Sequence, residues 1–246
     1  MNVLRSLVFY VVFYTASILF SVASILCLPL RGSRYRKVAN AWSAFHRWCV
    51  GHILGITVIT QGKRAEGPVL YAIKHESFFE AIDLATALGE PVVFAKEELF
   101  KIPAWGKALR EYGGIPVARG DGAKALRFML SEAKRFSSSG RPLIIFPEGT
   151  RVPHGTRPPL RAGFAALYKL LRLPVVPVAI DSGPLYHRNW KRRGTITIRF
   201  GDPIPAGLPR EEIEMRVHAA INELNSGAPT GGVPDAVADA GDQLPS

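Results

Sequence analysis

Two short segments carry side chains whose types and spacing could do chemistry. In the first, Glu80 follows His75 by five positions. A carboxylate bonded to one ring nitrogen of a histidine leaves the other nitrogen free to take a proton from a hydroxyl group. In the second, Gly149 and Arg151 follow an apolar run at residues 143–146. Glycine permits a sharp turn and arginine can make two parallel bonds to a phosphate, so this segment predicts an anion-binding turn.

Ser77 and Asp83 offer other interpretations of the first segment. A serine near a histidine could be a nucleophile, but residues two apart on a helix or turn do not face each other. Asp83 could replace Glu80 as the acidic partner, but it lies more than two helical turns from His75. We therefore expect His75 to act as a base with Glu80 as its partner.

Apolar runs and helical patterns alternate along the chain from residue 56 onward. Alternation of this kind is typical of α/β folds. We expect strands at residues 56–60, 69–73, 91–95, 115–118, 143–146, 175–180 and 195–200. We expect helices between them at about residues 78–88, 123–136, 162–171 and 211–224. Prolines inside the segment 173–180 favour an edge strand or a bulge there.

Charged residues follow several of these predicted strands. His75, Lys96 and Arg119 each come just after one of them. Ligand sites of α/β folds commonly form where strand ends converge on one edge of the sheet. We therefore expect Lys96 and Arg119 to line a phosphate site beside His75.

The N-terminal segment has the character of a membrane anchor. Residues 6–30 carry no charged side chain, and a bilayer-spanning helix needs about 20 residues. A helix that enters only one leaflet and a cleaved signal peptide are the alternatives. Four basic residues crowd residues 31–37, whereas Arg5 stands alone before the apolar run. This asymmetry predicts that the rest of the chain lies in the cytoplasm.

Residues 34–53 predict a second helix with an apolar face and a polar face that carries Arg36 and Arg47. It is either an ordinary helix packed on the core or an interfacial helix whose arginines meet anionic lipid. We expect three regions: a membrane-associated helical pair at 1–54, an α/β domain at 55–225, and a disordered tail at 226–246, which is rich in Gly, Ala, Pro and Asp.

Composition narrows the class of protein. The chain has 246 residues, 48% of them hydrophobic, and a formal net charge of +11. Such a charge attracts nucleic acid, anionic lipid headgroups or phosphorylated substrates, and the apolar N-terminus favours the lipid partners. Cys27 and Cys49 form neither a disulfide framework nor a metal-ligand spacing, so we interpret both as packing residues.

Taken together, these features resemble the family of 1-acyl-glycerol-3-phosphate acyltransferases and related glycerolipid acyltransferases. Four blocks match in order: Lys74-His75 with Glu80, Gly114-Ile115-Pro116-Val117-Ala118-Arg119, Phe146-Pro147-Glu148-Gly149-Thr150-Arg151, and Val176-Pro177-Val178. The family's first block usually ends in aspartate. Glu80 keeps the charge there and adds one methylene group.

The resemblance implies a mixed sheet flanked by helices, with the membrane-anchoring helical pair before it. It also implies that His75 is the general base and that Glu80 orients it. The implied ligands of the acceptor's phosphate are Arg119, Glu148, Gly149, Thr150 and Arg151, with Lys96 as a further one.

The implied reaction moves a fatty acyl group from an acyl thioester, of coenzyme A or acyl carrier protein, to the sn-2 hydroxyl of 1-acyl-glycerol-3-phosphate. The product is phosphatidic acid, an intermediate of phospholipid biosynthesis. We expect no cofactor and no metal. The expected partners are lysophosphatidic acid, the acyl thioester and anionic lipids of the inner membrane, but not nucleic acid.

Two alternatives to this function remain open. The same chemistry could act on another lyso-lipid acceptor. A non-catalytic, membrane-tethered basic module that binds anionic lipid or nucleic acid would also explain the charge, but it leaves His75 and Glu80 without a role.

Overall fold

The computed structural model describes residues 1–30, 32–103, 105–117 and 122–225. Its centre is a seven-stranded sheet with the order β1-β7-β6-β2-β5-β3-β4. The strands are β1 (Ile56–Gln61), β2 (Leu70–Ile73), β3 (Val92–Lys96), β4 (Ile115–Val117), β5 (Leu143–Ile145), β6 (Val175–Ile180) and β7 (Gly194–Phe200). All pairings are parallel except β6 with β7, so the sheet is mixed, as expected.

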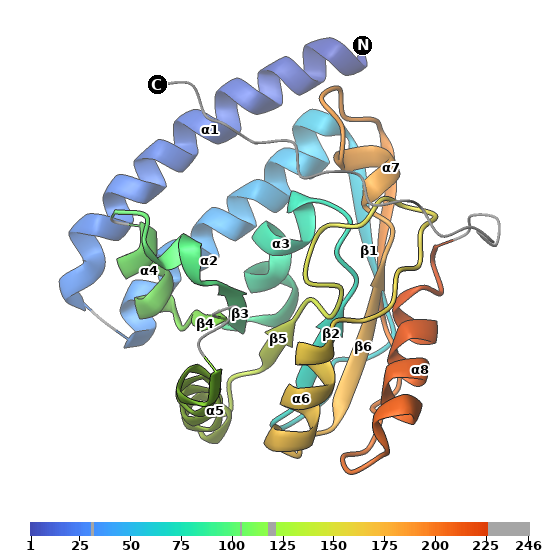
Figure 1. The fold of residues 1–246 in the computed structure, drawn as a ribbon. Coiled ribbons are helices and arrows are strands. Elements are labelled where there is room, and N and C mark those ends of the chain that lie inside the picture. Colours follow the sequence, from blue (N-terminus) through green and yellow to red (C-terminus); the bar gives the residue numbers. More distant parts are fainter. Residues whose placement is uncertain (31, 104, 118–121, 226–246) are drawn as a thin grey trace.

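Helices cover both faces of this sheet (Figure 1). One apolar core joins the sheet to α1 (Asn2–Cys27), the π-helical turn Val50–Leu54 and α3 (Phe78–Leu88). The other core joins it to α5 (Gly122–Ser138), α6 (Ala162–Leu171) and α8 (Arg210–Ile221). The remaining helices are α2 (Gly32–Cys49), α4 (Trp105–Tyr112) and α7 (Gly183–Tyr186), and short 3-10 turns occupy Leu28–Leu30 and Glu97–Phe100.

Strand β2 lies at the centre of the fold and is buried on both sides. Tyr71 and Ile73 belong to the first core, while Leu70 and Ala72 belong to the second. Successive side chains of a strand point to opposite faces, so four apolar residues in a row fill both cores. The chain that leaves β2 therefore starts from a rigid base, and His75 lies two residues beyond it.

Strand β6 is also an interior strand, so the prediction that it is an edge strand is wrong. Its proline, Pro177, is tolerated because the ladder to β7 is interrupted beside it. Val178 pairs with Phe200, and the next bridge joins Val175 to Ile204. Residues 176–177 of β6 therefore face the three residues 201–203. This is the arrangement of a bulge, which was the other expectation for this segment.

Helix α1 is the one helix among the described residues that is long and apolar enough to cross a membrane. It is buried at Ser6, Phe9 and Phe13, all in its N-terminal half. Helix α2 runs alongside it (Figure 1), and Trp42 of α2 donates a 2.9 Å hydrogen bond to Ser17 Oγ of α1. The expected helical pair is therefore present and attached to the domain.

The polar face of α2 turns toward the protein. It forms four contacts with α3, α4 or the second residue after α3: Arg36 with Glu90, Asn40 with Tyr112, Ser43 with Thr86, and Arg47 with Asp83. Of the two interpretations of this segment, the helix packed on the core is confirmed. The arginines that were candidates for anionic lipid are paired with carboxylates instead.

The predicted strands and long helices agree with the structure to within a few residues, whereas α4 and α7 were not predicted. Cys49 is buried and Cys27 half-buried, both as free thiols. The predicted disordered tail at residues 226–246 lies outside the described residues.

Candidate active site

The carboxyl ends of four parallel strands meet at one edge of the sheet. β6, β2, β5 and β3 are consecutive in the strand order and run in the same direction. His75 follows β2, Phe146 follows β5, Lys96 ends β3 and Ser182 follows β6. The expectation that His75 and Lys96 share an edge is therefore confirmed, and the turn at residues 148–151 follows β5 at the same edge.

A capping box at the start of α3 positions the acidic partner of His75. Ser77 is the N-cap residue, and its Oγ accepts a 3.0 Å hydrogen bond from the backbone N–H of Phe79. Glu80, at the third helical position, accepts a 2.9 Å bond from the N–H of Ser77 through Oε2. This reciprocal arrangement satisfies two free donors of the helix terminus. It also fixes the Glu80 carboxylate beside His75, which precedes the N-cap by two residues.

The His75 ring faces that carboxylate. Its Nδ1 lies 3.5 Å from Glu80 Oε2, and this buried nitrogen makes no hydrogen bond within the described residues. The ring stacks on Phe146, with centroids 4.1 Å apart and planes 22° apart. Its side chain is 15% exposed, so Nε2 is left for a substrate. Catalytic contacts are often long without substrate and shorten when it binds.

Ser182 is a contact of Glu80 that the sequence interpretation missed. Its Oγ donates to Glu80 Oε1 and lies 2.7 Å from Ser77 Oγ. Ser182 is fully buried and Glu80 is 1% exposed. The carboxylate therefore has a hydrogen-bond donor on each oxygen, as a buried charge requires. The signal was available, because Ser182 follows a predicted strand just as His75 does.

The two alternatives at the first segment have other roles. The hydroxyl of Ser77 is used as a helix cap, and the carboxylate of Asp83 is bound by the guanidinium of Arg47. Burial raises the pKa of Asp83, and the hydrogen bond from Arg47 opposes that shift. Neither residue takes the place of Glu80 at the His75 ring.

Glu148 does not face the substrate side of the site, so its assignment as a phosphate ligand is corrected. Oε1 lies 2.6 Å from Nζ of Lys74, and Oε2 accepts a 3.0 Å bond from the backbone N–H of His75. Glu148 is 2% exposed and Lys74 is fully buried. A carboxylate would also repel a phosphate. Glu148 instead joins the anion-binding turn to the catalytic strand end.

The other residues of the turn lie closer to the surface. Gly149 has a φ of 70°, a left-handed conformation that favours glycine. Thr150 and Arg151 are exposed. The Arg151 guanidinium lies 4.0 Å over the ring of Phe78, the first residue of α3, and no carboxylate of the described residues pairs with it. This contact keeps the cation at the entrance of the site without neutralising it.

The two remaining predicted phosphate ligands are Lys96, which the structure describes, and Arg119, which it does not. Lys96 is the exposed last residue of β3, at the same sheet edge as His75. Arg119 lies outside the described residues. Among the described residues, no group of three or more His, Cys, Asp or Glu side chains is placed to hold a metal ion.

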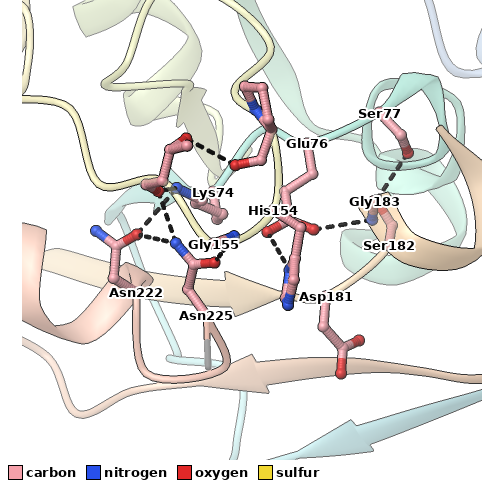
Figure 2. A network of polar contacts seen from close by, with 12 residues as sticks. Lys74, Glu76, Ser77, His154, Gly155, Asp181, Ser182, Gly183, Asn222 and Asn225 are labelled. Atoms are coloured by element: carbon pink, nitrogen blue, oxygen red, sulfur yellow. Dashed lines mark hydrogen bonds and ion pairs between the residues drawn. The ribbon is translucent and has the colours of Figure 1, made fainter. Parts of the chain in front are cut away.

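A buried polar network supports the turn from behind (Figure 2). Asn222, just after α8, accepts a 2.9 Å bond from Lys74 Nζ. Asn225 donates to the carbonyl of Thr156 at 2.6 Å and accepts from the N–H of Gly155. The chain after α8 thus holds residues 155–156, which follow the anion-binding turn. Sequence patterns carry no sign of this contact, because its partners lie about 70 residues apart.

A second histidine–carboxylate pair belongs to the same network (Figure 2). His154 Nδ1 lies 2.9 Å from Glu76 Oε1, and the N–H of Gly183 donates to Glu76 Oε2 at 2.8 Å. Burial raises the pKa of Glu76, while the hydrogen bonds from Gly183 and His154 oppose the shift. A Cβ at Gly183 would lie 2.9 Å from Glu76 Oε2, so this close approach requires glycine.

Comparison with known proteins identifies the kind of site. A family model described as Acyltransferase matches residues 55–181, just over half of the chain. The chain belongs to the acyltransferase family. This acyltransferase carries the His75–Glu80 pair and the turn at residues 146–151 inside the matched region, whereas Ser182 and the residues after α8 lie beyond it.

Named relatives agree with this assignment. The acyltransferase is 29% identical over 231 residues to a 1-acyl-sn-glycerol-3-phosphate acyltransferase of Pseudomonas aeruginosa, covering 92% of this chain and 87% of that protein. It is 27% identical over 216 residues to the human 1-acyl-sn-glycerol-3-phosphate acyltransferase alpha, covering 83% of this chain and 75% of that protein.

A solved structure confirms the fold. The crystal structure of the 1-acyl-sn-glycerophosphate (LPA) acyltransferase from Thermotoga maritima superposes with a TM-score of 0.69 at 23% identity. The match covers 92% of this acyltransferase and 98% of that chain.

Proposed function

We propose that this acyltransferase moves a fatty acyl group from an acyl thioester to the sn-2 hydroxyl of 1-acyl-glycerol-3-phosphate, forming phosphatidic acid. One observation carries the proposal. A histidine held beside a buried carboxylate shares a sheet edge with Arg151, a cation that no carboxylate of the described residues neutralises. The names of the relatives support this choice of acceptor.

His75 acts as the general base in this proposal. Glu80 faces Nδ1, so Nε2 takes the proton of the acceptor hydroxyl as its oxygen attacks the thioester carbonyl. The new C–O bond forms, the C–S bond breaks, and the proton passes from Nε2 to the leaving thiolate. Glu80 stabilises the imidazolium that exists between these two transfers. Because both substrates are held together and the thioester is already activated, no acyl-enzyme is required.

The anion-binding turn holds the acceptor's phosphate. Arg151 supplies a guanidinium that can bind two phosphate oxygens at once. Gly149 and Thr150 shape the turn, and Lys96 brings further positive charge from the end of β3. Arg119 is the further proposed ligand of the phosphate. Glu148 contributes indirectly, through Lys74 and the backbone of His75.

The donor is an acyl thioester of coenzyme A or of acyl carrier protein, and the reaction uses no other cofactor. Proton transfer by His75 and displacement of a thiolate are complete without a redox group. No nucleic acid takes part. The positive charge of the chain serves phosphate and anionic lipid instead.

The enzyme works at the cytoplasmic side of the inner membrane. Arg5, Ser6 and Tyr10 of α1 contact Leu54, Lys191 and Asn189 of the globular part. Only the outer side of α1 is free for lipid, which favours insertion into one leaflet over a crossing. The acceptor is a membrane lipid, so this anchoring raises its concentration near His75.

An acceptor comparison tests the proposal. The purified full chain in detergent is given a labelled acyl thioester and, separately, lysophosphatidic acid or a lysophospholipid whose phosphate is a diester. We expect labelled phosphatidic acid as the main product, because a phosphate monoester carries more negative charge toward Arg151. Equal or faster turnover of the diester acceptors would contradict the proposed substrate. The two thioester donors are compared in the same assay.

A further inference from the structure

The loop between α7 and β7 is strongly basic. Residues 187–193 read His-Arg-Asn-Trp-Lys-Arg-Arg. Neither Arg188 nor Arg192 is ion-paired within the described residues. The proposed reaction uses none of these residues, and the family model ends before them.

Buried contacts with α1 fix the conformation of this loop. Lys191 is 8% exposed, and its Nζ donates to the carbonyl of Tyr186 at 2.9 Å and lies 4.0 Å over that residue's ring. The N–H of Lys191 donates to Ser6 Oγ at 2.9 Å, and Tyr10 donates its hydroxyl to the carbonyl of Asn189 at 2.5 Å. The loop therefore has a fixed conformation, held by residues of α1 and α7.

The residues on either side of Lys191 point outward. Arg188, Trp190 and Arg192 are exposed, and Trp190 has an exposed fraction of 47%. Together with Asn2 and Asn189 they line a cleft of about 330 Å³. Arg188 donates a 3.2 Å hydrogen bond to the carbonyl of Pro184, but neither guanidinium has a carboxylate partner among the described residues. Two such guanidiniums in one small cleft suit a phosphate group, because each can make parallel hydrogen bonds to its oxygens.

The surroundings of the cleft indicate where that phosphate comes from. The first turns of α1 expose Val3, Leu4, Leu7 and Val8 beside it, with exposed fractions from 43% to 68%. An apolar helix face next to tryptophan and arginine is the composition of a membrane interface. The N-terminus of α1 and α7 lie together at one end of the molecule (Figure 1).

We propose that the cleft formed by Arg188, Trp190, Arg192 and Asn2 binds the phosphate of an anionic phospholipid headgroup in the membrane surface. The site is separate from the one proposed for the acceptor. It anchors the N-terminal end of α1 at headgroup depth while the apolar face of the helix enters the lipid. The proposed site does not depend on which reaction the enzyme catalyses, since it binds a lipid of the membrane surface and not a substrate.

Vesicle partitioning tests this site without measuring turnover. The full chain is mixed with phosphatidylcholine vesicles with and without phosphatidylglycerol, and the ratio of the two partition coefficients is measured by sedimentation. We expect Arg188→Gln/Arg192→Gln to lower this ratio by about 30-fold, since each charge near an anionic surface contributes roughly 5-fold. Arg188→Lys/Arg192→Lys should retain most of it. Inorganic phosphate at matched ionic strength should reduce it only partly, because a free phosphate competes for the two guanidiniums but has no acyl chains in the bilayer.

A matched control removes the same charge elsewhere. Lys134 and Lys169 are exposed. Their helices, α5 and α6, lie at the opposite end of the molecule from α7 (Figure 1). Lys134→Gln/Lys169→Gln should change the ratio by less than about 2-fold, because charges beyond a Debye length are screened. An equal fall in both double variants would overturn the site, since net charge alone would then explain the binding.

Trp190 gives a second readout that reports the location. Quenching by lipids labelled at the headgroup should be weaker in Trp190→Phe than in the unchanged chain, with the same three other tryptophans present in both. Equal quenching would overturn the proposal. An unchanged vesicle ratio together with a raised KM for acyl carrier protein thioesters would overturn it in favour of a docking site for an acidic protein.

Discussion

Ser182, at the end of β6, donates its hydroxyl hydrogen bond to Oε1 of Glu80, at the start of α3. This contact fixes the carboxylate from the side opposite the capping bond. We expect Ser182→Ala to lower kcat by about 10-fold, because a hydrogen bond to a charged group contributes roughly 1.5–3 kcal/mol. The KM values of both substrates should change little. Steady-state kinetics on the full chain measures the split.

The control for this change is Ser131→Ala, which removes a hydroxyl from the exposed face of α5. It should leave kcat unchanged. If Ser182→Ala raised either KM instead of lowering kcat, Ser182 would belong to a binding surface and not to the support of Glu80.

Much of this architecture could be predicted from sequence because its signals are local. Alternating apolar runs specify strands, and the interval between Ser77 and Glu80 specifies a helix start. The polar face of α2 was ambiguous, since an arginine such as Arg47 looks the same whether it meets lipid or Asp83. The supports of the site at Ser182 and Asn225 join residues about 70 or more positions apart, and local patterns do not encode such pairings.

Arg151 should decide the affinity for the acceptor. Arg151→Ala should raise the KM of lysophosphatidic acid by roughly 10- to 100-fold, the equivalent of about 1.5–3 kcal/mol for a charge-assisted bond. Arg151→Lys should give a KM between those of the unchanged enzyme and of Arg151→Ala, because lysine keeps the charge but loses the bidentate geometry. The KM of the acyl thioester, measured at saturating acceptor, should stay within a few-fold of its original value.

An exposed arginine of α8 provides the control for that series. Arg210, which contacts Glu214, lies on another element, and Arg210→Ala should not alter the acceptor's KM. A parallel rise in the KM of both substrates with Arg151→Ala would show that Arg151 maintains the turn itself.

The buried ion pair of Lys74 and Glu148 should be costly to break. Glu148→Gln leaves the Lys74 ammonium buried without a carboxylate, which typically destabilises a protein by about 3–5 kcal/mol. Adding Lys74→Met to this variant should restore part of the loss, since the unpaired charge is then absent. Thermal unfolding in detergent follows both. A loss below about 1 kcal/mol in the single variant, the range of surface pairs, would contradict this expectation.

His46 should make the fold sensitive to acid. Burial lowers the pKa of His46 from 6.5 to about 3, and its Nε2 lies 2.8 Å from the Tyr186 hydroxyl. Between the unfolded pKa of 6.5 and the folded pKa of about 3, the unfolded chain binds a proton at His46 that the folded chain does not. Stability therefore falls as the pH falls through this range. Between pH 7 and pH 5 the loss should be about 2 kcal/mol.

Two histidine variants isolate that effect. His46→Gln should reduce the fall in the unfolding midpoint between pH 7 and pH 5. His52 is exposed, so His52→Gln should leave this fall unchanged. An equally steep acid dependence in His46→Gln would assign the sensitivity to other groups.

The central claim is that His75 removes the proton of the acceptor hydroxyl, and the most direct measurement is the kcat of His75→Ala with lysophosphatidic acid and a saturating thioester. We predict a loss of about 10²–10⁴-fold, the usual contribution of a general base. The unfolding midpoint and membrane binding should remain those of the unchanged chain, because His75 belongs to neither apolar core. A His75→Ala enzyme that turns over at a near-normal rate would contradict the mechanism, whatever the acceptor.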